Sequence, residues 1–419
     1  SGRIARLEDE IMNSEMPYIS FVVTARNDDH GGNMLRRMQI SVTGLMQQVK
    51  KHNLDCELIL VEWNPVPDRP RLYQALSWSE RPSRCKVRII TVPPDVHNRF
   101  HHSEKVSLFQ MIAKNVGIRR ARGHFVLATN IDVLFSEELF DFLASKTLDS
   151  QYLYRVDRYD VPGGVPTNVT YQQQLDYCRN SVIRVNRRDG TYPQEALRWI
   201  WAWRIRLGLS LLSRFARHLI RGSVKIHDEL IVKTTTASRL PKFTASRPVD
   251  RADLFRIAIR FLKERVFSPY PKLHTNASGD FTLLAREHWH ALRGYPELEV
   301  HSFYLDFIFC HMAYHHGLQE KILQDPMRIY HMEHGSGWTP QEDDRMKQRL
   351  IIAGIPLVEF RSWITKMQKE KRPMILNDEE WGLASENLLE ISLNRCQYRA
   401  EPVVNEKGAD QSGGQSCNT

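Results

Sequence analysis

Long apolar runs and helical stretches alternate along the first third of the chain. Continuous apolar, β-rich runs occupy residues 18–25, 57–64, 86–92 and 123–130. Between them, residues 33–51 and 105–122 carry apolar side chains at helical spacing. Strands without a polar face that alternate with helices are typical of a parallel sheet covered on both faces. The pattern therefore predicts an α/β fold built on such a sheet.

Polar side chains follow three of these predicted strands. They lie at residues 24–29, 62–64 and 130–132. In open parallel sheets the ligand lies beyond the carboxyl ends of the strands. We therefore expect these three segments to meet at one ligand-binding edge of the sheet.

Beyond residue 180 the composition of the chain changes several times. It becomes basic and helical, then sheet-like and aromatic at 273–335, then helical again, and its last part has the composition of disorder. The predicted organisation is an N-terminal extension, two halves of one α/β domain separated by a basic helical insertion, a helical C-terminal extension and a disordered tail. The corresponding boundaries are 1–16, 17–180 and 273–345 for the two halves, 181–272, 346–399 and 400–419.

The basic insertion holds the entire excess of positive charge. Residues 181–272 contain 20 Lys and Arg against seven Asp and Glu, a net charge of +13, whereas the whole chain carries +9. On a helical wheel, residues 197–221 separate an apolar side from a side rich in arginine, and residues 251–266 repeat this pattern. Such helices are typical of an anionic membrane surface. Packing on the protein's own domain is the alternative, and no recognised motif supports nucleic-acid binding.

Cysteine usage and hydropathy bear on the compartment. No window of 18 apolar residues exists and the first ten residues lack an apolar core, so neither a membrane-spanning helix nor a signal peptide is expected. The six cysteines lie far apart without a C-x-x-C pair, which excludes a cysteine zinc cluster and gives no disulfide framework. We expect a cytoplasmic, peripheral membrane protein, and sequons at Asn168 and Asn276 keep a Golgi or secretory location open.

Several motifs carry a family resemblance. They are F-V-V-T-A-R-N-D-D at 21–29, K-N-V-G-I-R-R-A-R-G-H-F-V-L-A-T-N-I-D-V-L-F at 114–135, G-D-F-T-L-L-A-R-E-H-W-H-A-L-R-G-Y-P-E at 279–297, and the stretches 305–317 and 330–334. In this order and spacing, over about residues 17–340, the chain resembles glycosyltransferases of the GT-A fold and family-2 type. The resemblance implies a GT-A (Rossmann-like) sheet, a UDP-linked sugar donor, a divalent Mn²⁺ or Mg²⁺ ion, and a glycan or lipid-linked acceptor.

The resemblance also implies a metal site. A divalent cation would stabilise the negative charge that grows on the diphosphate as the glycosidic bond breaks. Such cations take carboxylate oxygens and, for manganese, an imidazole. Asp132 is the expected carboxylate ligand and His331 the expected imidazole, with His334 as its alternative. Asn130 replaces the first acid of the family's D-x-D motif.

Asp306 is the expected general base. An inverting transferase needs a carboxylate to take the proton of the acceptor hydroxyl. Asp306 precedes Gly317 by the family's eleven residues, although Leu305 replaces the first acid of the family's pair. The alternative role for Asp306 is that of an acid at a helix N-terminus, which the helix dipole favours. The residues expected on the nucleotide side of the site are Thr24, Arg26, Asp28, Glu62, Lys114, Asn115, Asn130 and Asp280.

Two other functions compete with transfer. A nucleotidyltransferase that builds sugar nucleotides needs a Gly-rich, Arg-containing loop after its first strand, and R-N-D-D-H-G-G is too acidic and polar to match. A glycosyltransferase-like binding protein without turnover is favoured by Asn130 and Leu305, which stand where the family has acids.

Overall fold

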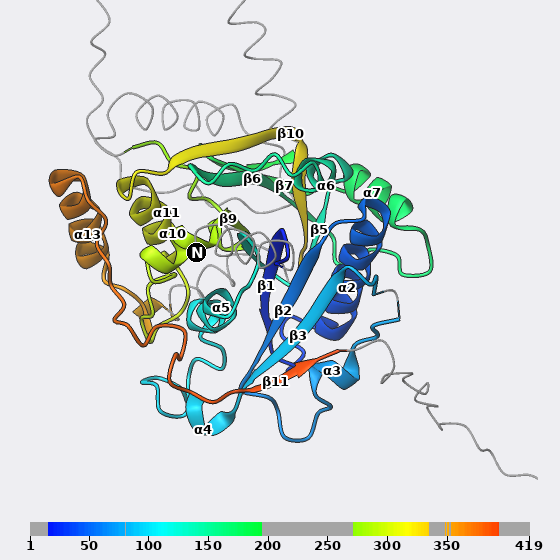
Figure 1. Ribbon diagram of the computed structural model, residues 1–419, viewed down its shortest axis with the longest axis horizontal. Coiled ribbons are helices and arrows are strands. Elements are labelled where there is room, and N and C mark those ends of the chain that lie inside the picture. The colour runs from blue at the N-terminus through cyan, green and yellow to red at the C-terminus, as the bar shows by residue number, and fades with distance from the viewer. Residues whose placement is uncertain are drawn as a thin grey trace, which may run out of the picture.

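The structure is a computed structural model that describes residues 16–194 except 80, residues 271–334, residues 348, 350 and 351, and residues 353–393. The described strands form one sheet of 11 strands (Figure 1). Its order is β11-β3-β2-β1-β4-β9-β6-β10-β5, and the hairpin β7–β8 is attached to β6. The bounds are β1 Ile19–Ala25, β2 Cys56–Trp63, β3 Cys85–Val92, β4 Phe125–Thr129, β5 Val133–Phe135, β6 Tyr152–Val161, β7 Arg184–Arg187, β8 Gly190–Pro193, β9 Phe281–Ala285, β10 Gln319–Met332 and β11 Leu389–Ser392.

Most strands run in the same direction. The pairs β3–β2, β2–β1 and β1–β4 are parallel, as is β6–β10. Strand β9 is antiparallel to both β4 and β6, so β6 and β10 point the same way as β4. The carboxyl ends of these strands therefore share one edge of the sheet.

Helices cover both faces of the sheet, as Figure 1 shows. Helices α2 (Met34–His52) and α6 (Glu137–Ala144) pack on one face, and α5 (Gln110–Arg119), α10 (Arg286–Ala291) and α11 (Leu305–His315) pack on the other. Alternate residues of each strand feed the two cores: Phe21 and Val23 of β1 face α2, while Val22 faces α5. A strand buried on both faces has no polar side, which explains its continuous apolar sequence.

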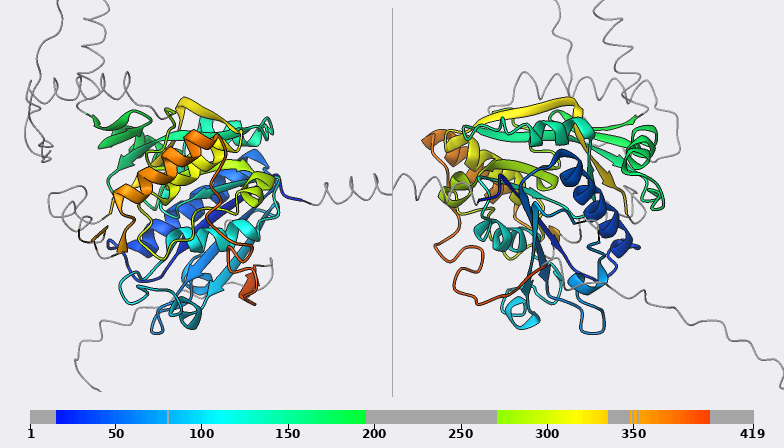
Figure 2. Two further views of the ribbon diagram at one scale, coloured as in Figure 1. Left: turned by 90° about the vertical axis from the view of Figure 1, so that its left-hand side faces the viewer. Right: turned by 45° about the vertical axis from the view of Figure 1, so that its right-hand side comes forward.

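The remaining described helices are short or peripheral. Helix α13 packs outside α11 (Figure 2), with the rings of Phe307 and Phe360 5.0 Å apart. The bounds are α3 Leu72–Ala75, α4 Pro94–His97, α7 Tyr171–Asn180, the 3₁₀ turn η1 Ser278–Asp280 and α13 Leu357–Glu370.

The predicted α/β fold class is confirmed: a mostly parallel sheet, as expected for a Rossmann-like domain, lies between two layers of helices. The four predicted strands and the first predicted helix lie within two residues of their expected bounds, whereas helix 105–122 is shorter, at Gln110–Arg119. The two predicted halves share one sheet, because β9 lies between β4 and β6.

Two parts of the predicted organisation are wrong. Residues 184–193, assigned to the helical insertion, form the hairpin β7–β8; Val185 lies opposite Tyr192 and Gly190 follows the turn. The described part of the C-terminal extension is not helical throughout, because its last residues pair with β3 as strand β11. An open sheet edge is a ready template for such a strand.

Several predictions lie outside the described residues: the N-terminal extension, the amphipathic helices at 197–221 and 251–266, and the tail. Among the helices that are described, none has the length and apolarity needed to cross a bilayer. The four described cysteines, Cys56, Cys85, Cys178 and Cys310, are free and buried.

Candidate active site

Three predicted metal ligands meet at the carboxyl edge of the sheet. Asp132 follows β4, and His331 and His334 lie at the end of β10. Strand β5 follows Asp132 directly and pairs with β10, with Val133 opposite His331. This register brings the carboxylate of Asp132 beside both imidazoles.

The three side chains have the geometry of an ion site. Nε2 of His331 lies 3.7 Å and Nε2 of His334 lies 3.9 Å from Oδ2 of Asp132. One ligand atom from each residue lies within 4.8 Å of the others. An octahedral ion with bonds of about 2.1 Å needs ligand atoms about 3 Å apart, so small side-chain movements close the site. One carboxylate with two imidazoles fits a divalent transition metal.

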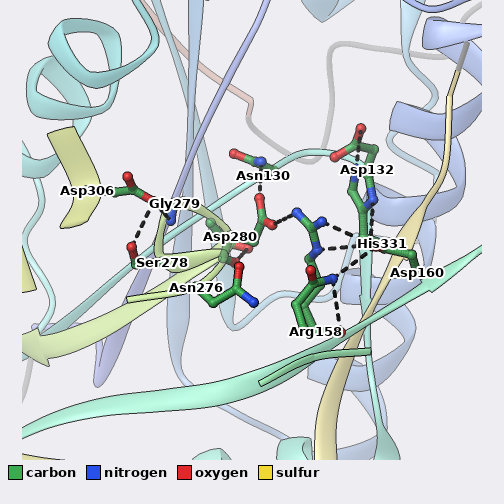
Figure 3. Close-up of polar contacts among 12 residues, drawn as sticks. Asn130, Asp132, Arg158, Asp160, Asn276, Ser278, Gly279, Asp280, Asp306 and His331 are labelled. Carbon is green, nitrogen blue, oxygen red and sulfur yellow. Dashed lines mark hydrogen bonds and ion pairs between the residues drawn. The ribbon is translucent and has the colours of Figure 1, made fainter. Parts of the chain in front are cut away.

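His331 is oriented by a second carboxylate. Its Nδ1 lies 3.1 Å from Oδ1 of Asp160, which leaves Nε2 facing Asp132 (Figure 3). Metal-bound histidines are commonly held in this way. Burial alone would lower the pKa of His331, but the carboxylates of Asp132 and Asp160 raise it above its ordinary value. Burial alone would raise the pKa of Asp160, but Arg158, His331 and Arg184 hold it well below its usual range.

His334 rests on the glycine loop that follows β1. A Cβ atom on Gly31 would lie 2.6 Å from Nδ1 of His334, and the φ of Gly31 is +69°, so glycine is required there. Burial lowers the pKa of His334 to about 4, so its imidazole is neutral at pH 7 and keeps a lone pair for an ion. Arg37 donates to the carbonyl oxygens of His30 and Gly32, and its Nε lies 3.9 Å from Oδ2 of Asp132.

Asp306 lies in the first turn of α11 and is held by η1. Its Oδ2 accepts hydrogen bonds from Oγ of Ser278 at 2.8 Å and from the backbone N–H of Gly279 at 2.6 Å. Its Oδ1 accepts from the N–H of Phe307. In the view of Figure 3, Asp306 and Asp132 stand on opposite sides of Asn130 and Asp280.

Four polar side chains form the floor between these two carboxylates; Lys114 and Asp280 are buried, and Asn130 and Arg158 are partly exposed. Nζ of Lys114 donates to Oδ1 of Asn130 at 2.8 Å and to the carbonyl oxygen of Gly279 at 2.5 Å. Nδ2 of Asn130 donates to Asp280, whose other oxygen pairs with Arg158. Burial lowers the pKa of Lys114 to about 8, although Asp280, Asp306 and Asp132 oppose this shift. Through its two hydrogen bonds, Lys114 joins Asn130 to the turn η1 from the protein interior.

Three of the residues expected to contact the nucleotide are buried and form hydrogen bonds within the protein instead. Glu62 has no exposed surface, and its oxygens accept from Nε of Arg71 and the N–H of Leu72. Asn115 is equally buried and donates to the carbonyl oxygen of Tyr295. Thr24 donates to the carbonyl oxygen of Val61. The structure does not bring these side chains to the surface of the site.

Arg26 and Asp28 remain at the edge. Their side chains form an ion pair of 3.0 Å in the loop after β1, and both are partly exposed. Nε of Arg26 also donates to the carbonyl oxygen of Asn64, which ties the end of β1 to the end of β2. These two residues therefore keep a place from which they can contact a ligand.

Arg158 and Asp160 were missed by the sequence analysis. Both lie on β6, where Nε of Arg158 is 2.9 Å from Oδ1 of Asp160. Their signal was a run of charged residues inside an otherwise apolar segment, Y-L-Y-R-V-D-R-Y-D-V at 152–161. Charged side chains are almost never fully buried unless they are paired, so such a strand indicates partners in the interior.

Similarity to known proteins is found in three-dimensional structure and not in sequence. No family model matches the chain, and no curated protein matches it. Similar solved structures include S. aureus TarS, at a TM-score of 0.34 and 11% identity, covering 84% of this chain and 43% of TarS. Another is GalNAc-T7 with UDP, GalNAc and Mn²⁺, at a TM-score of 0.36 and 12% identity, covering 87% of this chain and 52% of GalNAc-T7. The chain spans about half the length of these two structures.

Proposed function

We propose that the protein is a metal-assisted, inverting glycosyltransferase that moves a sugar from a UDP-linked donor to an acceptor hydroxyl. The observation that carries this proposal is the meeting of Asp132, His331 and His334 at the carboxyl edge of the sheet. Ligands of such sheets bind at this edge. The resemblance of the sequence motifs to GT-A glycosyltransferases supplies the reaction class.

The roles of the residues follow from their contacts. A divalent cation, when bound, supplies charge stabilisation for the leaving diphosphate. Asp160 fixes the ring of His331 so that Nε2 is presented beside Asp132. Ser278 and Gly279 hold the carboxylate of Asp306, which would take the proton of the acceptor hydroxyl during a single displacement.

The donor atoms favour Mn²⁺ over Mg²⁺. Magnesium prefers oxygen ligands and keeps several waters, whereas imidazole nitrogen suits transition metals. Two of the three side chains in this cluster are imidazoles. We therefore propose that both histidines bind the ion and that the ion is Mn²⁺.

The acceptor and the compartment are proposed from charge. The basic segment at 181–272 suits a glycan or lipid-linked acceptor held at an anionic membrane surface, on the cytoplasmic side. A Golgi or secretory location is the alternative, and Asn168 of the first sequon is exposed.

The test uses the full chain and a panel of UDP-sugars, with Mn²⁺ or with EDTA. We expect Mn²⁺-dependent binding of UDP by calorimetry, and Mn²⁺-dependent release of UDP from one of the sugars. If neither occurs, the proposed function is wrong.

Binding without turnover would support the alternative of an inactive binding protein. One observation favours that alternative. The carboxylate of Asp306 already accepts three hydrogen bonds, from Ser278, Gly279 and Phe307, which leaves about one of its four acceptor sites for an acceptor hydroxyl.

A further inference from the structure

An amide and a carboxylate touch in the floor of the site. Asn130 follows β4, and Asp280 precedes β9. The register of the two antiparallel strands places Thr129 opposite Phe281, so their neighbours Asn130 and Asp280 come together. Nδ2 of Asn130 donates to Oδ1 of Asp280, as Figure 3 shows.

The partners of Asn130 require an amide. Its Oδ1 accepts from Nζ of Lys114 at 2.8 Å and from Nε2 of Gln110 at 2.9 Å, while its Nδ2 donates to Asp280. A carboxylate at this position would still accept from Lys114 and Gln110, but it has no proton for Asp280. Two ionised carboxylates would then be in contact, which is unfavourable. One member of the pair must therefore be the acid and the other the amide.

The negative charge of the Asn130–Asp280 pair lies close to two cationic side chains, Arg158 and Lys114. Asp280 is only 4% exposed, and its Oδ2 pairs with the guanidinium of Arg158. Lys114 is fully buried and reaches the same pair through Asn130. Without Asp280, Arg158 would keep Asp160 as its partner, but the positive charges of Arg158 and the buried Lys114 would be less well compensated, which is destabilising.

We infer that Asn130 and Asp280 act as one positioning unit, in which Asp280 supplies the negative charge that the Asn130-Ile131-Asp132 segment lacks at its first position.

The unit joins the two reactive sides of the site. On one side, Asp280 orients Arg158, which pairs with Asp160, the residue that holds His331. On the other side, Asn130 receives Lys114, which also donates to the carbonyl oxygen of Gly279. The backbone N–H of Gly279 donates to Asp306. The effect of the unit on sugar transfer rests on the proposed function, whereas the pairing itself is tested without substrate.

The test compares four proteins of the full chain by thermal unfolding at pH 8: wild type, Asn130→Asp, Asp280→Asn and the exchange variant that carries both changes. Asn130→Asp places two carboxylates in contact, so its unfolding midpoint should fall by about 4 °C or more. Asp280→Asn should also be less stable than wild type, because Arg158 loses one of its two carboxylate partners. The exchange variant restores the pair in reverse order, so it should recover most of both losses.

A second readout uses Mn²⁺ and UDP as probes, because a purely structural role would leave ligand affinity unchanged. Each single variant should weaken Mn²⁺-dependent UDP binding about tenfold, and the exchange variant should lie within about threefold of wild type. The inference is overturned if Asn130→Asp is as stable as wild type at pH 8, if it binds Mn²⁺ and UDP more tightly, or if the exchange variant is no better than the worse single variant. Absence of UDP binding by the wild type would count against the proposed function, while the unfolding comparison would still decide the pairing.

Discussion

Each reactive side chain of the candidate site depends on a neighbour from a distant part of the chain. His331 presents Nε2 to Asp132 because Asp160 of β6 holds Nδ1. Asp306 is oriented by the backbone N–H of Gly279. Substituting one carboxylate at a time therefore tests the proposed metal binding by Asp132 separately from the proposed proton transfer to Asp306.

Asp132→Ala should abolish Mn²⁺-dependent binding of UDP and leave the fold intact. The carboxylate contacts Arg37, His331 and His334 at 3.7 Å or more, so its removal breaks no short contact with them. Calorimetry with UDP, with and without Mn²⁺, measures the effect. Unchanged Mn²⁺-dependent affinity would remove Asp132 from the metal site.

Asp306→Asn should lower transfer by about 100-fold or more and leave UDP affinity near that of the wild type. General-base assistance is worth roughly 10²–10⁴-fold, and the amide oxygen can still accept from the N–H of Gly279. Turnover with the preferred UDP-sugar measures the first quantity and calorimetry the second. Comparable turnover in the variant would leave Asp306 as a helix N-terminal acid alone.

The buried carboxyl group of Glu297 should make the free energy of unfolding depend on pH. Burial raises the pKa of its carboxyl to about 7 from an ordinary value of 4.5, although Asn115 and Gly382 donate to it. Between these two values the folded protein keeps a proton that the unfolded chain has released. Its contribution to stability is therefore fully present below pH 4.5 and falls as pH rises to 7, by about 3 kcal/mol at most.

Glu297→Gln should remove this dependence, because the neutral amide keeps an oxygen for both donors. Urea unfolding at pH 5 and pH 8 measures the free energy of unfolding of both proteins. The advantage of the variant over wild type should grow between the two pH values. A constant difference would contradict the raised pKa of Glu297.

The residues of the site differed in how far the sequence revealed them. Asp132 could be placed at the site because it follows a strand of a parallel sheet, whereas His331 and His334 were expected there because the motif at 330–334 resembles the family's metal-binding segment. Arg158 could not, since its partners Asp160 and Asp280 are identified only by strand pairing. Glu62 was expected to face the nucleotide, but its role is decided by Arg71, which a local pattern does not reveal.

At the scale of elements, hydrogen bonds to backbone carbonyl oxygens hold the C-terminal segment 377–393 against the domain. Arg119 and Arg120 donate to carbonyl oxygens of this segment, including those of Trp381 and Gly382. Trp381 is buried, with the guanidinium of Arg119 5.0 Å from the centre of its ring. The segment ends in β11, which covers β3.

Gly382→Ala should loosen this attachment. The residue has a φ of +67°, and a Cβ atom there would lie 2.7 Å from the carbonyl oxygen of Asn115. Backbone strain of about 1–2 kcal/mol and overpacking of similar size should both lower the free energy of unfolding. Gly32→Ala is the matched control, because Gly32 has a φ of +75° and nothing within 4 Å of its Cβ position. Equal losses in urea unfolding would mean that the contact with Asn115 is relieved by a shift of the segment.

At the scale of the whole molecule, the sequence predicted the strands of the sheet best where strands and helices alternate. Strands β1 to β4 follow that rule, whereas β9 enters between β4 and β6 after a long insertion. No local signal states which neighbours such a strand takes. Strand β11 is four residues long with an exposed pattern, and it is stabilised by the ion pair of Glu390 with Arg88.

Net charge is divided unevenly between the basic insertion and the rest of the chain. Residues 195–270, which follow the β7–β8 hairpin, contain 16 Lys and Arg against six Asp and Glu, a net charge of +10, and the remaining residues of the chain sum to about −1. Like charges at this density repel one another without a counter-surface. Anionic lipid would supply one, at roughly 1 kcal/mol per basic residue near the surface.

The protein should therefore bind anionic vesicles, bind neutral vesicles only weakly, and lose much of the binding at high salt. Vesicle co-sedimentation should show that Arg206, Arg214 and Arg217, changed together to Glu, weaken binding strongly. The control changes Arg361, Lys366 and Lys369 to Glu, three exposed residues of α13, and alters the net charge equally. If the control loses binding as much as the first variant, net charge rather than the insertion is responsible. If wild type does not sediment, or sediments no more than the first variant, the insertion packs on its own domain instead.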